Sequence, residues 1–229
     1  MEILRQNNYN IVHLIDGKLI TEAIELINKG QADGINFNFV KNFPSNIDEI
    51  KLAPRLKYIQ INDYPTSREF DYSAIDFLSN LNNLSVYTND KKEINFFNYP
   101  FLKTAAINWR PKANSLYRCK NLERLFIAKY KDSDLTKFEN LTDLEYLRIN
   151  TGSIKSLDGI EKLEKLQTLL LLQLTKLEDL NGIDRLPNLR QLRIENCRNI
   201  KNIDIVSNLK KIETLEIIGT TPRLKINVF

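Results

Sequence analysis

Aliphatic residues recur along the chain in one pattern. Leu-x-x-Leu-x-Leu, with Ile, Val or Ala accepted at each apolar place, begins eight times, and successive starts lie 20 to 25 residues apart. A period of this length indicates a repeat architecture, in which each repeat buries its apolar side chains by stacking on its neighbours. The eight starts are Leu56, Leu81, Leu102, Leu122, Leu144, Leu166, Leu189 and Ile212.

Two patterns of apolar spacing alternate within each repeat. Counted from the start, positions 4 and 6 are apolar while positions 3, 5 and 7 vary, as in a strand whose successive side chains face opposite sides. After the strand, apolar residues follow at steps of three, as at Ile154, Leu157, Ile160 and Leu163. This spacing predicts a tight 3₁₀-like return rather than a long α-helix.

The repeats resemble the leucine-rich repeat family in its short bacterial type, because the last four steps are 22 or 23 residues. The resemblance covers residues 52–219 and implies an α/β fold: a right-handed solenoid of about eight repeats, with a curved parallel β-sheet on the concave face and short 3₁₀ or irregular returns on the convex face. The family usually carries Asn or Cys at the ninth position, as Asn89 and Cys197 do here. Arg110 and Tyr130 occupy that position in the middle repeats, so we expect a local bend or opening there.

Residues 1–51 do not follow the repeat and predict an N-terminal α/β cap. Asn10–Ile15 and Gly34–Phe39 are expected to be strands. Thr21–Asn28 is expected to be a short helix, with its first residue as N-cap and Gly30 closing it.

Two further expectations concern the ends of the chain. An alternative for Ile11–Ile20 is a hairpin that turns at the Asp16-Gly17 pair. Residues 220–229 predict a short C-terminal cap, because apolar and polar residues alternate there. The apolar residues of that segment are Leu224, Ile226 and Val228.

The chain of 229 residues is 42% hydrophobic and 27% charged, which is typical of a globular protein. No apolar run approaches the roughly 18 residues of a membrane helix. The N-terminus shows no basic start followed by an apolar stretch, so we expect a cytoplasmic protein. The single histidine, His13, and the two cysteines, Cys119 and Cys197, are too scattered for a structural zinc site, and we expect free thiols.

Catalysis finds little support in the sequence. The phosphate-binding patterns Gly-x-x-x-x-Gly-Lys-Ser/Thr and Gly-x-Gly-x-x-Gly are both absent. We interpret His13 as a packed or surface residue, Cys197 as part of the turn scaffold and Cys119 as a core residue. The sequence therefore predicts a protein that is not an enzyme and needs no cofactor or metal.

The natural binding surface is the strand face that carries positions 3, 5 and 7. Aromatic, Arg and Leu residues gather there, which is the composition of an interface hot spot. Alternatively, a flanking segment covers Leu170 and Leu172. The predicted partner-binding residues are Tyr87, Trp109, Arg124, Phe126, Tyr146, Arg148, Leu170, Leu172 and Arg193.

Charge is uneven along the chain. Residues 1–100 hold 10 Lys and Arg against 13 Asp and Glu, a balance of −3, whereas residues 101–229 hold 23 against 16, a balance of +7. Residues 101–131 form either a solvated basic flank or a patch for an acidic partner, which charge would help to recruit. Their basic residues are Lys103, Arg110, Lys112, Arg118, Lys120, Arg124, Lys129 and Lys131.

These features favour non-catalytic binding of another protein. The resemblance to small bacterial repeat proteins implies an adaptor, inhibitor or immunity-like role. One alternative is a structural or regulatory subunit of an enzyme complex. A less favoured alternative is nucleic-acid binding through residues 101–131, because the net charge is only +4 and no nucleic-acid-binding motif is present.

Overall fold

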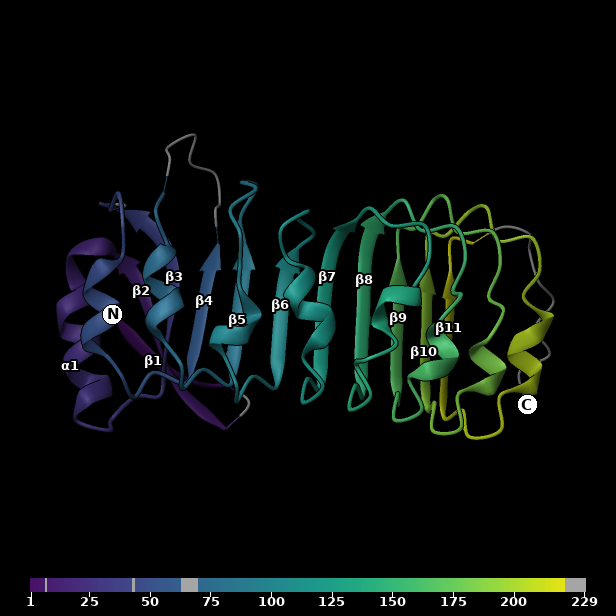
Figure 1. Cartoon of the computed structure of the whole chain (residues 1–229), viewed down its shortest axis with the longest axis horizontal. Helices are drawn as coiled ribbons and strands as arrows, with labels where there is room; N and C mark the ends of the chain where they lie inside the picture. The colour runs from purple at the N-terminus through teal and green to yellow at the C-terminus, as the bar shows by residue number, and fades with distance from the viewer. Residues whose placement is uncertain (7, 43, 63–69, 221–229) are drawn as a thin grey trace. The chain divides into compact units, whose positions relative to one another are not determined.

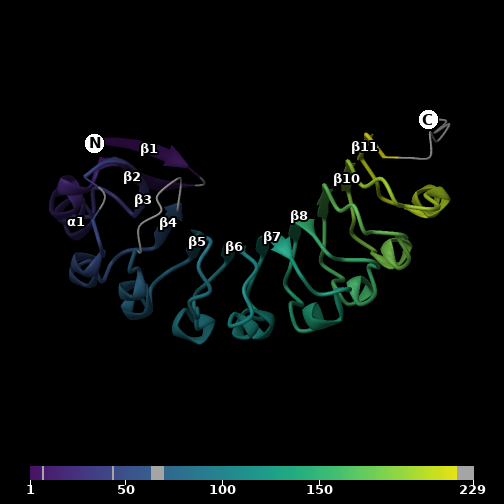
Figure 2. The same cartoon turned by 90° about the horizontal axis from the view of Figure 1, so that it is seen from above.

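The computed structural model describes residues 1–6, 8–42, 44–62 and 70–220. The chain forms two compact units, Met1–Leu116 and Tyr117–Phe229. Within each unit the strands lie on one side and short 3₁₀ helices on the other (Figures 1 and 2). We call the segments between strands the returns, and the sheet face turned away from them the open face.

The first unit holds one α-helix, α1 (Ile20–Asn28), and a sheet in which β1 pairs antiparallel with β2. From β2 to β6 each strand pairs in parallel with the next. The strands are β1 (Glu2–Gln6), β2 (Tyr9–Asp16), β3 (Gly34–Lys41), β4 (Tyr58–Asn62), β5 (Asn83–Tyr87) and β6 (Thr104–Asn108). The 3₁₀ helices are η1 (Gly17–Leu19), η2 (Asp48–Leu52), η3 (Ser73–Phe77), η4 (Phe96–Asn98) and, where the chain leaves the unit, η5 (Asn114–Arg118).

The second unit repeats one coil, and its neighbouring strands all pair in parallel and in register. Its strands are β7 (Arg124–Tyr130), β8 (Tyr146–Gly152), β9 (Thr168–Leu172), β10 (Gln191–Glu195) and β11 (Thr214–Ile218). Its 3₁₀ helices are η6 (Thr136–Phe138), η7 (Ile160–Lys162), η8 (Ile183–Arg185) and η9 (Asp204–Asn208). Parallel strands joined by short 3₁₀ returns confirm the predicted fold class.

The core consists of the aliphatic residues that define the repeat. On β8, Leu147 and Ile149 are fully buried, and so are Ile154, Leu157 and Ile160 of the return that follows. Neighbouring repeats place equivalent residues side by side, because the parallel register pairs position 4 with position 4 along the sheet. The core is therefore a set of aliphatic layers that run across the strands.

Left-handed backbone occurs at or near the end of each of the five strands of the second unit. The residue after position 7 has a φ of 55° to 61° in every one of these repeats. Only one of these residues is Gly and one is Asn, the types that adopt this conformation most easily, so the other three store backbone strain. The residues are Lys129, Thr151, Gln173, Asn196 and Gly219.

The N-terminal segment corrects two sequence-based expectations. Residues Glu2–Gln6 form β1, which hairpins onto β2, so the alternative of a hairpin over Ile11–Ile20 is wrong. Asp16 instead accepts a hydrogen bond from the Lys18 amide and caps η1. The expected Thr21 cap is also wrong: α1 begins at Ile20, and the Thr21 hydroxyl donates to Glu49.

Other terminal predictions fare differently. The predicted strands Asn10–Ile15 and Gly34–Phe39 are confirmed as parts of β2 and β3. Gly30 has a φ of 73° after α1, which confirms its role in ending the helix. The predicted C-terminal cap covers residues 220–229. Apart from Thr220, its residues lie outside the described part of the chain, including Leu224, Ile226 and Val228.

Arg110 fills the ninth position of its repeat with a buried polar network. It is 3% exposed, and its guanidinium donates to the Tyr72 hydroxyl at 2.6 Å, to Thr88 Oγ1 at 3.0 Å and to Asp90 Oδ1 at 3.3 Å. Burial opposes the charge of Asp90, but hydrogen bonds from Thr88 and Tyr72 and the charge of Arg110 lower its pKa. Tyr130 is likewise fully buried, so both turns are filled rather than open.

We expect Arg110→Leu to lower the free energy of unfolding of the first unit by about 2–4 kcal/mol, because Asp90, Tyr72 and Thr88 lose their shared donor. Urea unfolding followed by circular dichroism measures the change. Arg55→Leu is the control in the same unit, since Arg55 is exposed and its loss should cost less than about 1 kcal/mol. Equal effects of the two substitutions would contradict a stabilising network.

We expect Gln173→Gly to stabilise the second unit by about 0.5–1 kcal/mol, because Gly relieves the left-handed strain by more than its backbone entropy costs. Thermal unfolding provides the measurement. Gln167→Gly is the matched control: Gln167 is also exposed but does not have a positive φ, so there the substitution should lower stability. If both substitutions lowered stability, the idea that Gln173 stores backbone strain would be contradicted.

Candidate functional site

The open face is more exposed in the second unit than in the first. In the first unit Tyr58, Asn83, Ser85 and Ala106 occupy outward positions yet are buried. The Tyr58 ring lies 6.1 Å from that of Tyr9 on β2, so the N-terminal hairpin contributes to this burial. Part of the open face of the first unit is therefore covered by the protein itself.

The open face of the second unit carries side chains in three rows, because the strands pair in register. Position 5 places Phe126, Arg148, Leu170 and Arg193 side by side. Position 3 begins with Arg124 and Tyr146, and position 7 includes Leu172 and Glu195. The structure therefore brings together seven of the predicted site residues.

Arg124, Phe126 and Tyr146 form one stacked group on β7 and β8. The rings of Phe126 and Tyr146 lie 4.8 Å apart and are tilted by 33°. The Arg124 guanidinium carbon lies 4.2 Å from the centre of the Tyr146 ring and 5.7 Å from that of Phe126, within the range of a cation–π interaction. Neither ring is buried, so the group offers aromatic area with restricted side-chain freedom.

A hollow of about 330 Å³ lies beside this stack. Leu170 is half-buried and Leu172 is 8% exposed, so these leucines form an apolar wall. Arg193 is held by two carboxylates: it donates to Glu195 at 2.6 Å and to Glu216 at 2.9 Å. The hollow is lined by Arg148, Asn150, Leu170, Leu172, Gln173, Arg193 and Glu195.

Tyr87 and Trp109, the other two predicted site residues, belong to the first unit. Tyr87 ends β5, Trp109 follows β6, and both are half-buried. The basic segment 101–131 is not a uniform patch, because Arg110 is buried and Arg124 is engaged with Tyr146. Charge counts along the sequence do not reveal such pairings.

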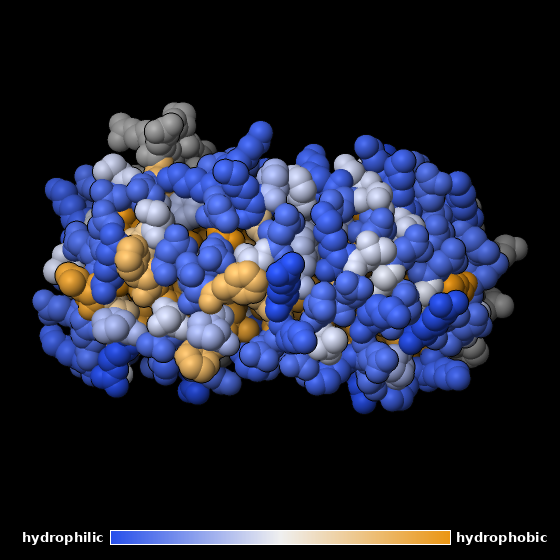
Figure 3. All heavy atoms as spheres, in the orientation of Figure 1, coloured by the Kyte–Doolittle hydropathy of each residue, from blue (hydrophilic) through white to orange (hydrophobic). Residues whose placement is uncertain are grey.

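Sequence reasoning missed a set of exposed apolar side chains on the returns of the first unit. Phe77 is 69% exposed, and three other large apolar side chains are more than half exposed. Figure 3 shows orange residues scattered among blue ones over this part of the molecule. The aromatic residues of these returns were the available signal, but a search restricted to the strands passes over them. The exposed side chains are Leu52, Phe77, Phe97 and Phe101.

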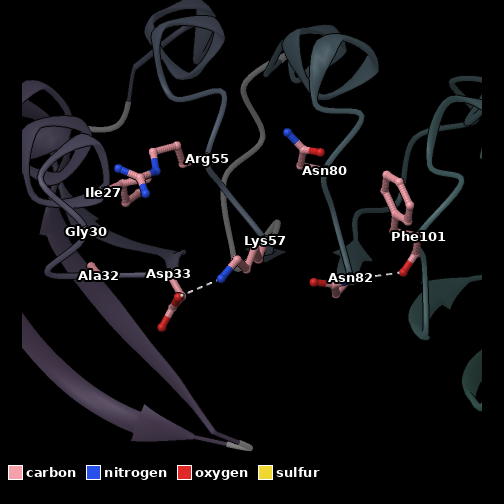
Figure 4. A pocket seen from close by; sticks show the side chains of 9 residues that line it. All are labelled: Ile27, Gly30, Ala32, Asp33, Arg55, Lys57, Asn80, Asn82 and Phe101. Atoms are coloured by element: carbon pink, nitrogen blue, oxygen red, sulfur yellow. Dashed lines mark hydrogen bonds and ion pairs between the residues drawn. The ribbon is translucent and has the colours of Figure 1, made fainter.

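A groove of about 410 Å³, lined in part by Phe101, lies among the turns that precede β3, β4, β5 and β6 (Figure 4). Lys57 reaches Asp33 at 3.4 Å across it, and the Asn82 amide donates to the Phe101 carbonyl at 2.9 Å. Arg55 donates weakly to the Asn28 carbonyl at 3.4 Å. The polar groups of the groove thus bond mainly to the protein itself.

The groups expected to be inert occupy structural positions. Cys197 is fully buried, and its Sγ lies 3.5 Å from the Leu171 and Glu195 carbonyls, which confirms its place in the turn scaffold. Cys119 and His13 are half-buried. Over the described ranges, no three His, Cys, Asp or Glu residues are grouped to hold a metal ion. Within the same ranges, no helix is long and apolar enough to cross a bilayer.

Comparisons with known proteins agree with this architecture. The family model of the leucine-rich repeat domain of endo-beta-N-acetylglucosaminidase EndoS matches residues 125–228. None of the curated proteins matches the sequence. Among solved structures, an internalin, InlF, from Listeria monocytogenes is 19% identical with a TM-score of 0.62, covering 83% of this chain and 55% of its own.

Two further structures are complexes. The TLR13–ssRNA13 complex is 18% identical with a TM-score of 0.60, covering 93% of this chain and 32% of that one. The Arabidopsis receptor kinase HAESA, bound to the peptide hormone IDA and the co-receptor SERK1, is 18% identical with a TM-score of 0.51, covering 76% of this chain and 32% of that one. The chain thus spans about half of the internalin and a third of each receptor.

The repeats, the parallel strands and these likenesses show the leucine-rich repeat fold. Two of the solved structures that share the fold are complexes, one with an RNA and one with a peptide hormone and a co-receptor.

We expect neither cysteine to behave as a nucleophile. Burial raises the pKa of Cys119 to about 11 and also raises that of Cys197. At pH 8, about a thousandth of Cys119 would be thiolate, the reactive form. Iodoacetamide labelling followed by mass spectrometry should be slow in the native protein and fast in guanidinium chloride. Rapid native labelling of Cys119 would contradict this expectation.

Proposed function

We propose that this protein binds a partner protein, without catalysis, through the open face of the second unit. The observation that carries the proposal is the Arg124–Phe126–Tyr146 stack beside the Leu170–Leu172 wall. Aromatic rings and Arg side chains held on rigid strands lose little entropy when a partner docks, which is the property of interface hot spots.

An acidic partner surface fits this face better than a basic one. The fifteen residues at positions 3, 5 and 7 of β7 to β11 include three cations, Arg124, Arg148 and Arg193, and two carboxylates, Glu195 and Glu216. The remaining charge is therefore positive and lies toward β7 and β8. We infer an adaptor, inhibitor or immunity-like role in the cytoplasm, in which the chain acts by occupying another protein.

We expect Arg124→Glu combined with Arg148→Glu to weaken partner binding at least about tenfold, because like charges then face each other. The tagged chain is used to isolate partners from its native cells, and calorimetry with the purified partner measures affinity. Lys162→Glu with Arg185→Glu, both on exposed returns, makes the same charge change away from the face and should bind normally.

Two outcomes would redirect the proposal. Undiminished binding by the face variant would reject this surface. A partner that co-purifies in fixed stoichiometry from the outset would instead favour a structural or regulatory subunit of a complex. Recovery of nucleic acid, with affinity that falls steeply as salt rises, would favour a nucleic-acid binder.

A further inference from the structure

The three arginines of the open face of the second unit have different surroundings. Arg124 stacks on Tyr146, and Arg193 is neutralised by Glu195 and Glu216. Arg148 makes no hydrogen bond, ion pair or ring contact with any residue that the structure describes. Arg193 therefore has its donors engaged, and of the two arginines without an acceptor in the described chain, Arg148 is the one that lines the hollow.

Arg148 lies among apolar side chains and has no ionic partner among the described residues. It is half-buried, and the register places it between Phe126 on β7 and Leu170 on β9. It also lines the 330 Å³ hollow together with Leu170 and Leu172. A guanidinium without an acceptor can bind an incoming anion, and apolar neighbours would strengthen that pair.

We propose that Arg148 is an anion anchor that receives the carboxylate of one Asp or Glu side chain of the partner protein. This inference rests on the proposed function and specifies its central contact. A carboxylate matches the fork of guanidinium donors and can accept two parallel hydrogen bonds. The leucine wall would exclude water from the pair and strengthen it, as apolar surroundings do for buried hot spots.

The charge around the hollow favours a single carboxylate over a nucleic-acid backbone. Glu195 lines the same hollow, and Glu216 lies on the neighbouring strand in register with Arg193. A chain of phosphates that continued past Arg148 in this direction would meet these two carboxylates. One isolated negative charge avoids that repulsion, and apolar atoms of the partner can cover Leu170 and Leu172.

The test selects random linear peptides displayed on phage against the wild-type full chain, and in parallel against Arg148→Gln. Arg185→Gln is the matched control, because it removes the same charge from an exposed return of the same unit. We expect wild-type and control selections to share an Asp or Glu at one fixed position, and the Arg148→Gln selection to lose it. Synthetic peptides are then measured by fluorescence polarisation.

In the synthetic peptides, we expect exchange of the fixed acid for its amide, or Arg148→Gln, to weaken binding about tenfold to a hundredfold, the range for a charge-assisted hydrogen bond. The two losses should not add, because each removes the same pair. Additive losses, or wild-type affinity in Arg148→Gln, would overturn the anchor.

The design separates the two proposals. Peptides that lose affinity with Tyr146→Ala but not with Arg148→Gln would leave the docking face standing and remove the carboxylate anchor. Peptides insensitive to both changes, or no enriched sequence at all, would count against both. Labelled single-stranded poly-uridine is tested alongside, and Arg148-dependent binding of that RNA would assign the anchor to phosphate instead.

Discussion

The parallel pairing of neighbouring repeats is the constraint on which the rest of this structure depends. A single coil of some twenty residues cannot bury its own aliphatic side chains, so each strand must pair in register with the next. That register places Leu147 beside Leu125 and Leu169. The same register fixes the neighbours on the opposite face, because successive side chains of a strand point to opposite faces of the sheet. Core and candidate site are therefore two consequences of one ladder.

The sequence predicts the ladder well because aliphatic spacing is a direct record of burial. Each repeat strand, from β4 to β11, begins at position 3 of its copy, as expected. Where tertiary contacts decide, the same reasoning fails. The strand β1 carries exposed residues throughout and has no periodic signature, since only its pairing with β2 makes it a strand. Thr21 has the chemistry of a cap, yet Glu49 takes its hydroxyl.

The sequence predicts which residues meet in the candidate site, but not how each of them is paired or buried. Register alone brings Phe126, Arg148 and Leu170 together. It does not indicate that Arg110 turns inward to Tyr72 and Thr88, because partners 22 and 38 residues away leave no local trace in sequence. Nor does it indicate which outward positions become covered. Tyr58 and Tyr146 occupy equivalent positions, but only Tyr58 is buried.

The two units differ in how many of their outward side chains are already paired, and this difference singles out the second unit as the candidate binding surface. In the first, several outward side chains bond within the unit: the Tyr58 hydroxyl donates to Gln60 at 2.9 Å, and the Asn108 amide donates to the Thr88 backbone carbonyl at 3.0 Å. Among the described residues, the buried Asn36 Oδ1 is an exception without a partner. Side chains whose donors and acceptors are already paired gain little from a partner. In the second unit, the aromatic rings near Arg124 are accessible and Arg148 is unpaired within the described chain. Paired side chains favour stability, whereas accessible and unpaired side chains favour recognition of a partner. Folding alone therefore does not explain the composition of the open face of the second unit.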